Sequence, residues 1–314
     1  MKKWAAFWAL GLIWGSSFLF IRIGVEQLSP FQVVFIRTGI AAIGLNLVLL
    51  SRGKHLPLNL KQLRPLIIIG LGNTTIPFAL ITTGEKAISS GLAAMLQSAA
   101  SLFTAILAHF FFVDERLTPQ KIVGLAVGFI GVIVLGSHSI VDGQIDLPLF
   151  LGAMAVVLAS LFYATFTIYS RKVIQNRFEP LMVSAGAMTF AAISSGICMV
   201  IAPLLGGQAA TPLNTVSSDV LIAVGLLGLV NTFITYLIYY WIIRELGAAR
   251  TSMVTYITPG VGLALGALVL QEPIDWRLLV GALLIFCGIA IVNLRIFSRF
   301  SLRRSIPLAS EEAA

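Results

Sequence analysis

Polar side chains recur at helical spacing within apolar segments of this 314-residue sequence, and they are residues that could bind a small solute. Gln97, Ser101 and Thr104 stand at positions i, i+4 and i+7, so a single helix would carry them on one face. Ser, Thr and Asn also commonly tie packed helices together, and that alternative stays open for each of them. The candidate substrate-binding residues are Trp14, Ser17, Asn73, Thr74, Gln97, Ser101, Tyr163, Thr167, Asn231, Thr235, Thr255 and Thr258.

Two charged residues have placements that suit transport chemistry. Arg37 lies inside an apolar segment, about 9 Å from the start of that segment at the rise of an α-helix. Its planar fork would capture a substrate carboxylate, whereas the alternative is an arginine that snorkels to the interface or tethers helices. Glu85 ends another apolar segment and is the candidate for coupling to protons; without such coupling, solute movement is facilitated.

The sequence shows no catalytic machinery. Ser16 and Ser17 follow a glycine, but no His or Lys stands at a comparable depth to activate them. Neither metal-ligand spacing nor a Gly-x-x-x-x-Gly-Lys phosphate loop occurs. We therefore expect no enzymatic activity, no metal and no cofactor. Cys198 and Cys287 fall in apolar segments and are expected to be small buried hydrophobic residues rather than a disulfide.

Composition places these residues in a membrane. Hydrophobic residues make up 58% of the chain and charged residues 11%, with a mean hydropathy of +0.97. A soluble domain carries roughly 25% charged residues. The apolar runs lack the two-residue alternation of barrel strands and are long enough to span a bilayer as helices. Ten spans are predicted, at residues 4–21, 31–50, 65–83, 90–113, 120–137, 147–170, 180–202, 220–243, 249–270 and 278–294.

The basic residues report membrane orientation rather than nucleic-acid binding. With a cytoplasmic N-terminus, 17 of the 21 Lys and Arg residues fall in segments facing the cytoplasm, as the positive-inside rule requires. We therefore expect a cytoplasmic (inner) membrane protein with both termini in the cytoplasm. The apolar run after Lys2 and Lys3 exceeds a signal-peptide core and lacks a cleavage site before Arg22, so we expect a first membrane helix.

An internal repeat organises the spans. Residues 70–76 (GLGNTTI) and 228–234 (GLVNTFI) match at five of seven positions, at an offset of 158 residues. Glu115 matches Glu272 at an offset of 157 residues. Each Glu precedes a segment with two glycines seven residues apart, and we expect it to cap a helix or tie two helices together. Because the repeated unit has five helices, the second copy must enter from the opposite face, as in many secondary transporters.

The predicted fold is therefore an all-α integral membrane protein with ten transmembrane helices in two inverted five-helix repeats. The first repeat covers residues 4–137 and the second 147–295, with a connector at 138–146 and a basic cytoplasmic tail at 296–314. Pro77 and Pro259 interrupt two helices near mid-span, where a kink could serve gating or packing. His109, near the end of a helix, is expected to be structural.

The chain resembles the EamA-type branch of the drug/metabolite transporter superfamily. The residues that carry the resemblance are Trp14-Gly15-Ser16-Ser17, Arg37, Asp114-Glu115-Arg116-Leu117, Gly124, Gly131, Thr258-Pro259, Gln271-Glu272-Pro273, Gly281 and Gly288. It covers residues 4–295, and the second half departs from the pattern with Tyr163-Ala164 where the first has Trp-Gly. The resemblance implies a ten-helix carrier, with amino acids and related metabolites leaving the cell as the leading substrates.

We therefore expect a secondary transporter that moves small zwitterionic or neutral metabolites out of the cell by alternating access. Its partners would be the solute and the lipid bilayer, without nucleic acid, and the protein would be a monomer or a homodimer. A nucleotide-sugar or other anionic-metabolite exchanger is the alternative within transport, and it would need several deep Lys or Arg besides Arg37. An intramembrane enzyme or a non-transporting scaffold is the alternative from another class.

Overall fold

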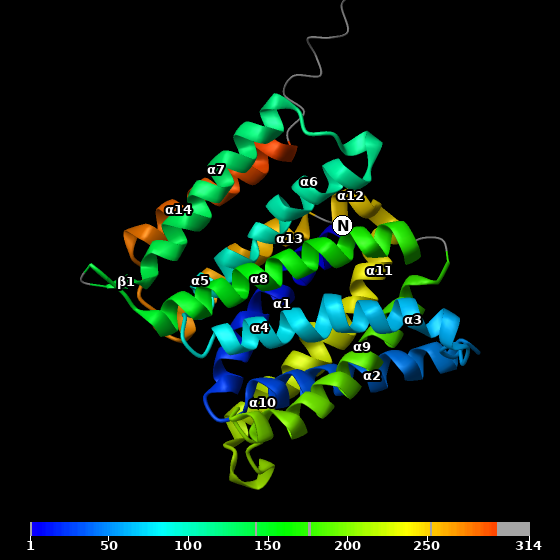
Figure 1. The fold of residues 1–314 in the computed structure, drawn as a ribbon. Helices are drawn as coiled ribbons and strands as arrows, with labels where there is room; N and C mark the ends of the chain where they lie inside the picture. The colour runs from blue at the N-terminus through cyan, green and yellow to red at the C-terminus, as the bar shows by residue number, and fades with distance from the viewer. Residues whose placement is uncertain (1, 142, 175–176, 252, 294–314) are drawn as a thin grey trace, which may run out of the picture.

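The computed structural model describes residues 2–141, 143–174, 177–251 and 253–293, and this part of the chain is almost entirely helical (Figure 1). Within it, nine helices are long and apolar enough to cross a membrane, and a tenth apolar helix, Val254–Val269, is shorter. The predicted all-α membrane fold is thereby confirmed. The end of the last predicted span and the predicted tail, residues 294–314, lie outside the described residues.

The elements of the first half are α1 (Lys2–Val25), α2 (Pro30–Ser51), α3 (Leu60–Ile69), η1 (Gly70–Thr75), α4 (Ile76–Gly84), α5 (Ser90–Gln97), α6 (Ala99–Phe111), η2 (Val113–Glu115), α7 (Pro119–Gly136) and η3 (Ser137–Ser139). Two short antiparallel strands follow, β1 (Ile140–Val141) and β2 (Gln144–Ile145). The elements of the second half are α8 (Leu147–Tyr169), η4 (Ser170–Ile174), α9 (Pro180–Ile201), η5 (Ala202–Leu205), η6 (Leu213–Thr215), α10 (Ser218–Gly228), η7 (Leu229–Ile234), α11 (Thr235–Leu246), α12 (Ala248–Thr251), α13 (Val254–Val269) and α14 (Trp276–Asn293).

Side-chain caps fix the starts of several helices. Ser29, Asp146 and Asp275 each accept a hydrogen bond from the backbone N–H three residues later, at 3.3, 3.1 and 2.8 Å. Such caps satisfy N–H groups that have no partner inside the helix, a need that is strongest where no water is available. The caps therefore fix where α2, α8 and α14 begin.

The two halves interlock rather than pack as separate bundles. The first helix of the first half, α1, packs against α10, α11 and α13 of the second half. The first helix of the second half, α8, packs in the same way against α4, α5 and α6 of the first half. The pairs α2–α9 and α7–α14 lie at opposite sides of the bundle (Figure 1). Each pair joins one helix from each half, so a relative movement of the halves changes contacts throughout the bundle.

Glycines set the close antiparallel contact between α7 and α14. A Cβ on Gly124 would lie 2.8 Å from the carbonyl oxygen of Gly288, and one on Gly131 would lie 2.8 Å from that of Gly281. Small residues of this kind let membrane helices approach closely. Because the helices are antiparallel, the loops that precede them lie at opposite ends of the bundle, here named the Glu115 end and the Glu272 end after their acidic residues. The charge distribution predicts that the Glu272 end faces outward.

Two predicted spans are interrupted. The span at 90–113 divides into α5 and α6 at Ser98, where hydrogen bonds from Ser98 N to Met95 O and from Ser101 N to Ser98 O, both 3.1 Å, tighten the turn. The span at 249–270 divides into α12 and α13. Gln97, Ser101 and Thr104 lie on one apolar helical span, Ser90–Phe111, with this tighter turn between Gln97 and Ser101.

The structure also corrects the placement of several charges and both cysteines. Helix α1 extends beyond its predicted end and holds Arg22 in its last turn, and α11 extends to include Glu245, although the predicted spans contained no acidic residue. Both cysteines are free, but Cys198 is only half-buried and Cys287 is exposed. In a membrane protein an apolar surface can face lipid, so an apolar environment does not imply burial in the protein.

Candidate functional site

The two matched segments of the internal repeat form π-helical turns. Residues 70–75 form η1 and residues 229–234 form η7, each between two α-helical parts of one span. In η1, Thr75 Oγ1 donates to Gly70 O at 3.0 Å, and in η7, Thr232 Oγ1 donates to Leu227 O at 2.8 Å. Both bonds reach five residues back. Widened turns of this kind are frequent at functional sites, because they release backbone and side-chain groups from regular helix pairing.

Each π-helical turn holds an asparagine with an unpartnered oxygen. Oδ1 of Asn73 and Oδ1 of Asn231 are buried and accept no hydrogen bond within the described residues. The amide nitrogen of Asn231 donates to Ser16 Oγ at 2.8 Å, to Ser17 Oγ at 3.2 Å and to the carbonyl of Ile13, so α1 holds its orientation. A buried acceptor without a donor costs about 1–3 kcal/mol. The two oxygens are thus available to a ligand that carries N–H or O–H groups.

Arg37 on α2 lies next to the second π-helical turn. Its side chain is buried, and its Nε donates to Thr232 Oγ1 at 2.8 Å. Its guanidinium carbon lies 3.9 Å from the ring centre of Phe78, which makes a cation–π contact. Phe78 lies on α4, in the same span as Asn73. Among the described residues, no acceptor is bound to its two terminal nitrogens, so they can form a bidentate pair with a carboxylate.

Two tyrosines lie near the guanidinium of Arg37. Tyr163 of α8 and Tyr236 of α11 both lie within electrostatic range of Arg37. Tyr236 contacts Tyr240 at 6.2 Å between ring centres, and Tyr239 contacts Trp14 at 5.4 Å. Aromatic rings with hydroxyl groups offer both apolar contact and hydrogen bonds. The environment of Arg37 therefore suits a small organic solute better than an inorganic ion.

Glu272 ties the two halves together at its end of the bundle. Its carboxylate accepts hydrogen bonds from the N–H of Ser90 at 2.8 Å, from the N–H of Gly91 at 3.1 Å and from Ser90 Oγ at 2.9 Å. Ser89 Oγ accepts from the N–H of Leu92 at 3.2 Å, so the first N–H groups of α5 are satisfied. Glu272, in a loop of the second half, thus holds α5 of the first half. Its negative charge also interacts favourably with the dipole at the N-terminus of that helix.

Glu115 makes a different contact at the opposite end. Its carboxylate forms an ion pair with Arg171, whose guanidinium lies 4.1 Å from the ring centre of Phe112. Both partners are partly exposed, with side-chain exposures of 38% for Glu115 and 40% for Arg171. Thr118 and Asp275 cap α7 and α14, so Glu115 and Glu272 are inter-helix ties rather than caps of the helices that follow them.

Glu85 is buried at the Glu272 end, directly after the span Leu60–Gly84. Both of its carboxylate oxygens lack a hydrogen-bond partner in the described part of the chain, while Arg22 donates to its backbone carbonyl. Burial, and secondarily the charge of Glu272, raises the pKa of this carboxyl well above 4.5. Arg22 and Arg37 act in the opposite direction without cancelling the effect.

The remaining predicted site residues have varied surroundings. Thr235 is fully buried and donates to Asn231 O at 2.7 Å, and Thr74 is buried in η1. Gln97 has a buried, unpartnered Oε1, a further orphan acceptor at the break between α5 and α6. Thr167 and Thr255 are exposed on α8 and α13. The half-buried residues are Trp14, Ser101, Tyr163 and Thr258, whereas Ser17 is buried.

The prolines and His109 contribute mainly to local structure. Pro77 is the second residue of α4, which follows η1 directly, so its missing N–H donor falls in the first turn after the π-helical turn. Pro259 lies buried inside α13, beside the contact of that helix with Gly15. His109 accepts a hydrogen bond at Nδ1 from the N–H of Leu117 at 3.1 Å, which fixes the loop between α6 and α7.

Sequence reasoning missed Thr232, Phe78 and Tyr236, all of which lie near Arg37. The repeat could have identified Thr232, because the offset of 158 residues that relates Asn73 to Asn231 also relates Thr74 to Thr232. Phe78 and Tyr236 carried no comparable signal, since aromatic residues are common on every face of apolar helices.

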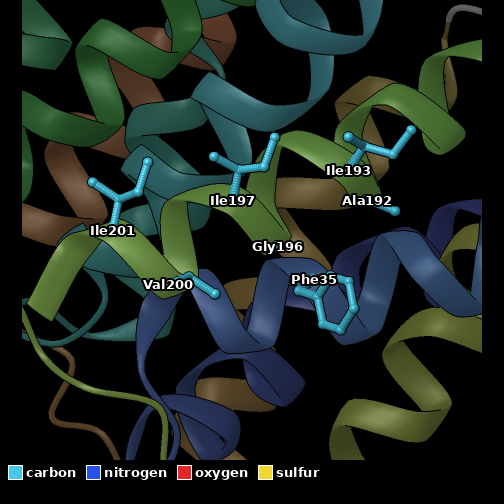
Figure 2. Close-up of a pocket in the computed structure, with 7 residues that line it drawn as sticks. All are labelled: Phe35, Ala192, Ile193, Gly196, Ile197, Val200 and Ile201. Carbon is cyan, nitrogen blue, oxygen red and sulfur yellow. The ribbon is translucent and has the colours of Figure 1, made fainter.

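A surface groove between α2 and α9 has different chemistry from the Arg37 site. It has a volume of about 490 Å³, and the residues that line it are all apolar (Figure 2): Phe35, Ala192, Ile193, Gly196, Ile197, Val200 and Ile201. No side chain in this groove can pair with a carboxylate or an ammonium group. It is not the place where a polar solute would bind.

Comparison with known proteins identifies the family of the chain. The sequence profile described as "EamA-like transporter family" matches residues 3–137 and again residues 150–294. An "Uncharacterized transporter" of Archaeoglobus fulgidus is 29% identical over 302 residues, covering 93% of this chain and 99% of the relative. The "Uncharacterized inner membrane transporter YedA" of Escherichia coli is 31% identical over 270 residues, covering 85% of this chain and 82% of the relative.

Two further similarities bear on substrate and fold. A protein of Escherichia coli described as "Probable amino-acid metabolite efflux pump" is 27% identical over 287 residues, covering 89% of this chain and 91% of the relative. A solved crystal structure superposes with a TM-score of 0.63 at 19% identity, over 93% of this chain and 98% of that one. The structural likeness speaks for a shared fold alone.

Proposed function

Because this chain belongs to the EamA-like transporter family, we propose that it is a secondary carrier that moves amino acids or related small zwitterionic and neutral metabolites out of the cell by alternating access. The relatives described as transporters support transport itself. Export and the amino-acid class are supported by the efflux-pump relatives of Escherichia coli and Salmonella typhimurium.

The observation that carries the substrate class is that the buried cation Arg37 contacts Thr232 in η7 and Phe78 just after η1, the two turns that hold the unpartnered asparagine oxygens. Arg37 offers two terminal nitrogens to a carboxylate, and Asn73 and Asn231 offer oxygens to an ammonium group. A free amino acid carries both charges, so it would satisfy groups that are otherwise unpaired. A solute with several phosphates would need more cations at this depth than Arg37 provides.

The arrangement of the halves supports alternating access. Arg37 and Thr232 come from opposite halves, and so do Glu272 and Ser90. A movement of one half against the other would therefore alter the solute site and the tie at the Glu272 end together. With the orientation predicted from the basic residues, that end is the one through which an exported solute leaves.

Counterflow in proteoliposomes tests this function. Vesicles containing the purified protein would be loaded with each of a panel of unlabelled amino acids and given trace amounts of the labelled form outside. We expect transient accumulation of the label for a subset of amino acids, and none in protein-free vesicles. The same vesicles loaded with nucleotide sugars or sugar phosphates should show no counterflow. Accumulation of those anions but of no amino acid would overturn the proposed substrate class.

A further inference from the structure

Glu85 has a combination of features that its position at a helix end does not explain. Its exposed fraction is 0%, and neither carboxylate oxygen has a partner among the residues that the structure describes. An ionised carboxylate in such surroundings is strongly disfavoured, and the usual response is to bind a proton. In contrast, the carboxylate of Glu272 accepts three hydrogen bonds from α5.

The charged groups that face Glu85 come from three elements. Arg22 of α1 and Arg37 of α2 are positive, and Glu272 in the loop between α13 and α14 is negative. Helix α8 meets the same end of α4 through uncharged residues at Gly84. Lys86, the next residue in the chain, is exposed and donates from Nζ to Gln208 Oε1 at 2.7 Å. Neither arginine is hydrogen-bonded to the carboxylate of Glu85.

We propose that Glu85 is a proton-binding site that controls the tie between Glu272 and α5, an inference that rests on the proposed carrier function. With its proton bound, Glu85 is neutral and leaves Glu272 in place on the N–H groups of Ser90 and Gly91. When the proton leaves, the buried carboxylate of Glu85 adds a second negative charge within electrostatic range of Glu272. Repulsion then weakens the tie, and the halves can separate at the Glu272 end.

The backbone around Glu272 places its carboxylate against α5. Gly266 of α13 leaves room for the carboxylate, since a Cβ there would lie 2.3 Å from Glu272 Oε2. The N–H of Glu272 donates to Gly266 O at 3.1 Å, and the intervening Gln271 has φ 54°, the left-handed conformation that commonly ends a helix. The tie to α5 therefore consists of the three hydrogen bonds of the carboxylate itself, and these are the interactions that a second negative charge nearby would weaken.

Distance measurements between spin labels test the proposal without any substrate. Cys198→Ser and Cys287→Ser give a background without native thiols, in which Thr83→Cys on α4 and Ile274→Cys after Glu272 carry the labels. Both labelled positions are exposed and lie in different halves. We expect a short-distance population that dominates at acidic pH and declines in favour of a longer distance as the pH rises. Infrared spectra of the same samples should show the C=O band of a protonated carboxylic acid disappearing over the same pH range.

Variants separate the role of Glu85 from a general effect of pH. Glu85→Gln should keep the short distance at every pH and lack the carboxylic acid band. Glu272→Gln should favour the longer distance at every pH, because a neutral amide holds the helix N-terminus less strongly. Glu26→Gln, which removes an exposed carboxylate at the same end, should behave like the parent protein.

The outcomes keep this inference distinct from the proposed function. Distances that do not change with pH in the parent protein, or that change equally in Glu85→Gln, would overturn the proton switch even if amino-acid counterflow is found. A pH-dependent distance change that needs Glu85 would support the switch even if the counterflow panel identifies a different solute class.

Discussion

Arg37 of α2 donates a hydrogen bond from Nε to Oγ1 of Thr232 in η7 at 2.8 Å. The two residues are 195 positions apart and belong to opposite halves of the internal repeat. Thr232 Oγ1 in turn donates to the carbonyl of Leu227, five residues back in the π-helical turn. The irregular turn therefore fixes the side chain of Thr232, which fixes the guanidinium that we assign to the substrate carboxylate.

Replacement of Arg37 tests that assignment. Arg37→Lys keeps a positive charge but loses the planar pair of donors, so we expect the KM of amino-acid transport to rise by roughly tenfold or more, as loss of about 1.5–3 kcal/mol implies. Initial rates in proteoliposomes measure this change. Arg52→Lys, at an exposed position beyond α2, serves as the matched control and should leave KM unchanged. An unchanged KM for Arg37→Lys would assign Arg37 a structural role.

Thr232 is predicted to act by positioning Arg37. Thr232→Val removes the acceptor of the Arg37 Nε bond and should raise KM by about fivefold, whereas Thr232→Ser should restore transport because it retains the hydroxyl. Thr75→Val removes the corresponding hydroxyl bond of η1, from Thr75 Oγ1 to Gly70 O, without touching Arg37, and is the matched control. Equal losses in both valine variants would show that the hydroxyls only stabilise the π-helical turns.

Asn73 offers a test of recognition of the amino group. The parent protein should bind an amino acid better than the corresponding 2-oxo acid, which lacks the ammonium group. We expect Asn73→Ala to reduce this preference by roughly tenfold or more, since one hydrogen bond to a charged group is lost. Competition against labelled substrate in counterflow measures the preference. A preference that stays the same in Asn73→Ala would show that the orphan oxygen does not contact the solute.

Gly266 is predicted to be essential for the tie made by Glu272. Gly266→Val places a side chain where the carboxylate lies and should lower the melting temperature in detergent by roughly 3–10 °C, as loss of charge-assisted bonds implies. Gly260→Val on the same helix is the control, because a Cβ there meets nothing within 4 Å. Similar melting temperatures for the two variants would contradict the structural role of the tie.

Glu85 should give the folded protein a characteristic pH dependence. Because burial raises the pKa of its carboxyl above 4.5, the folded state binds more protons than the unfolded state above that value. The stabilisation is complete below about pH 4.5 and is lost as the pH rises through the raised pKa. Thermal unfolding of the parent protein should therefore show a melting temperature that declines with pH, and Glu85→Gln should show a smaller decline. Parallel curves would contradict the buried, proton-binding carboxyl.

Much of the fold follows from the sequence because the bilayer restricts what apolar segments can do. Apolar length predicts spanning helices, and the match of Asn73 with Asn231 identifies the repeat. The breaks in the spans are harder to predict. The turn at Ser98 and the π-helical turns depend on contacts with helices distant in sequence, and apolar periodicity does not encode them.

The candidate site is only partly predictable for a related reason. Arg37 is conspicuous because a charge in an apolar segment needs a partner, but its neighbour Phe78 is one of many aromatic residues. The burial of Glu85 could not be predicted from the sequence either, since a residue at the end of a predicted span could equally face water. The packing of the two halves against each other determines both the contact of Arg37 with Phe78 and the burial of Glu85. That packing forms only in the folded chain.

Competition between an amino acid and its carboxamide tests the central claim most directly. The carboxamide keeps the ammonium group and the side chain but lacks the carboxylate that Arg37 is proposed to bind. In counterflow with the parent protein, we predict that the amino acid competes at least tenfold better than its carboxamide, and that this difference disappears in Arg37→Gln. Equal competition by the two compounds in the parent protein would contradict the assignment of Arg37 to the substrate carboxylate.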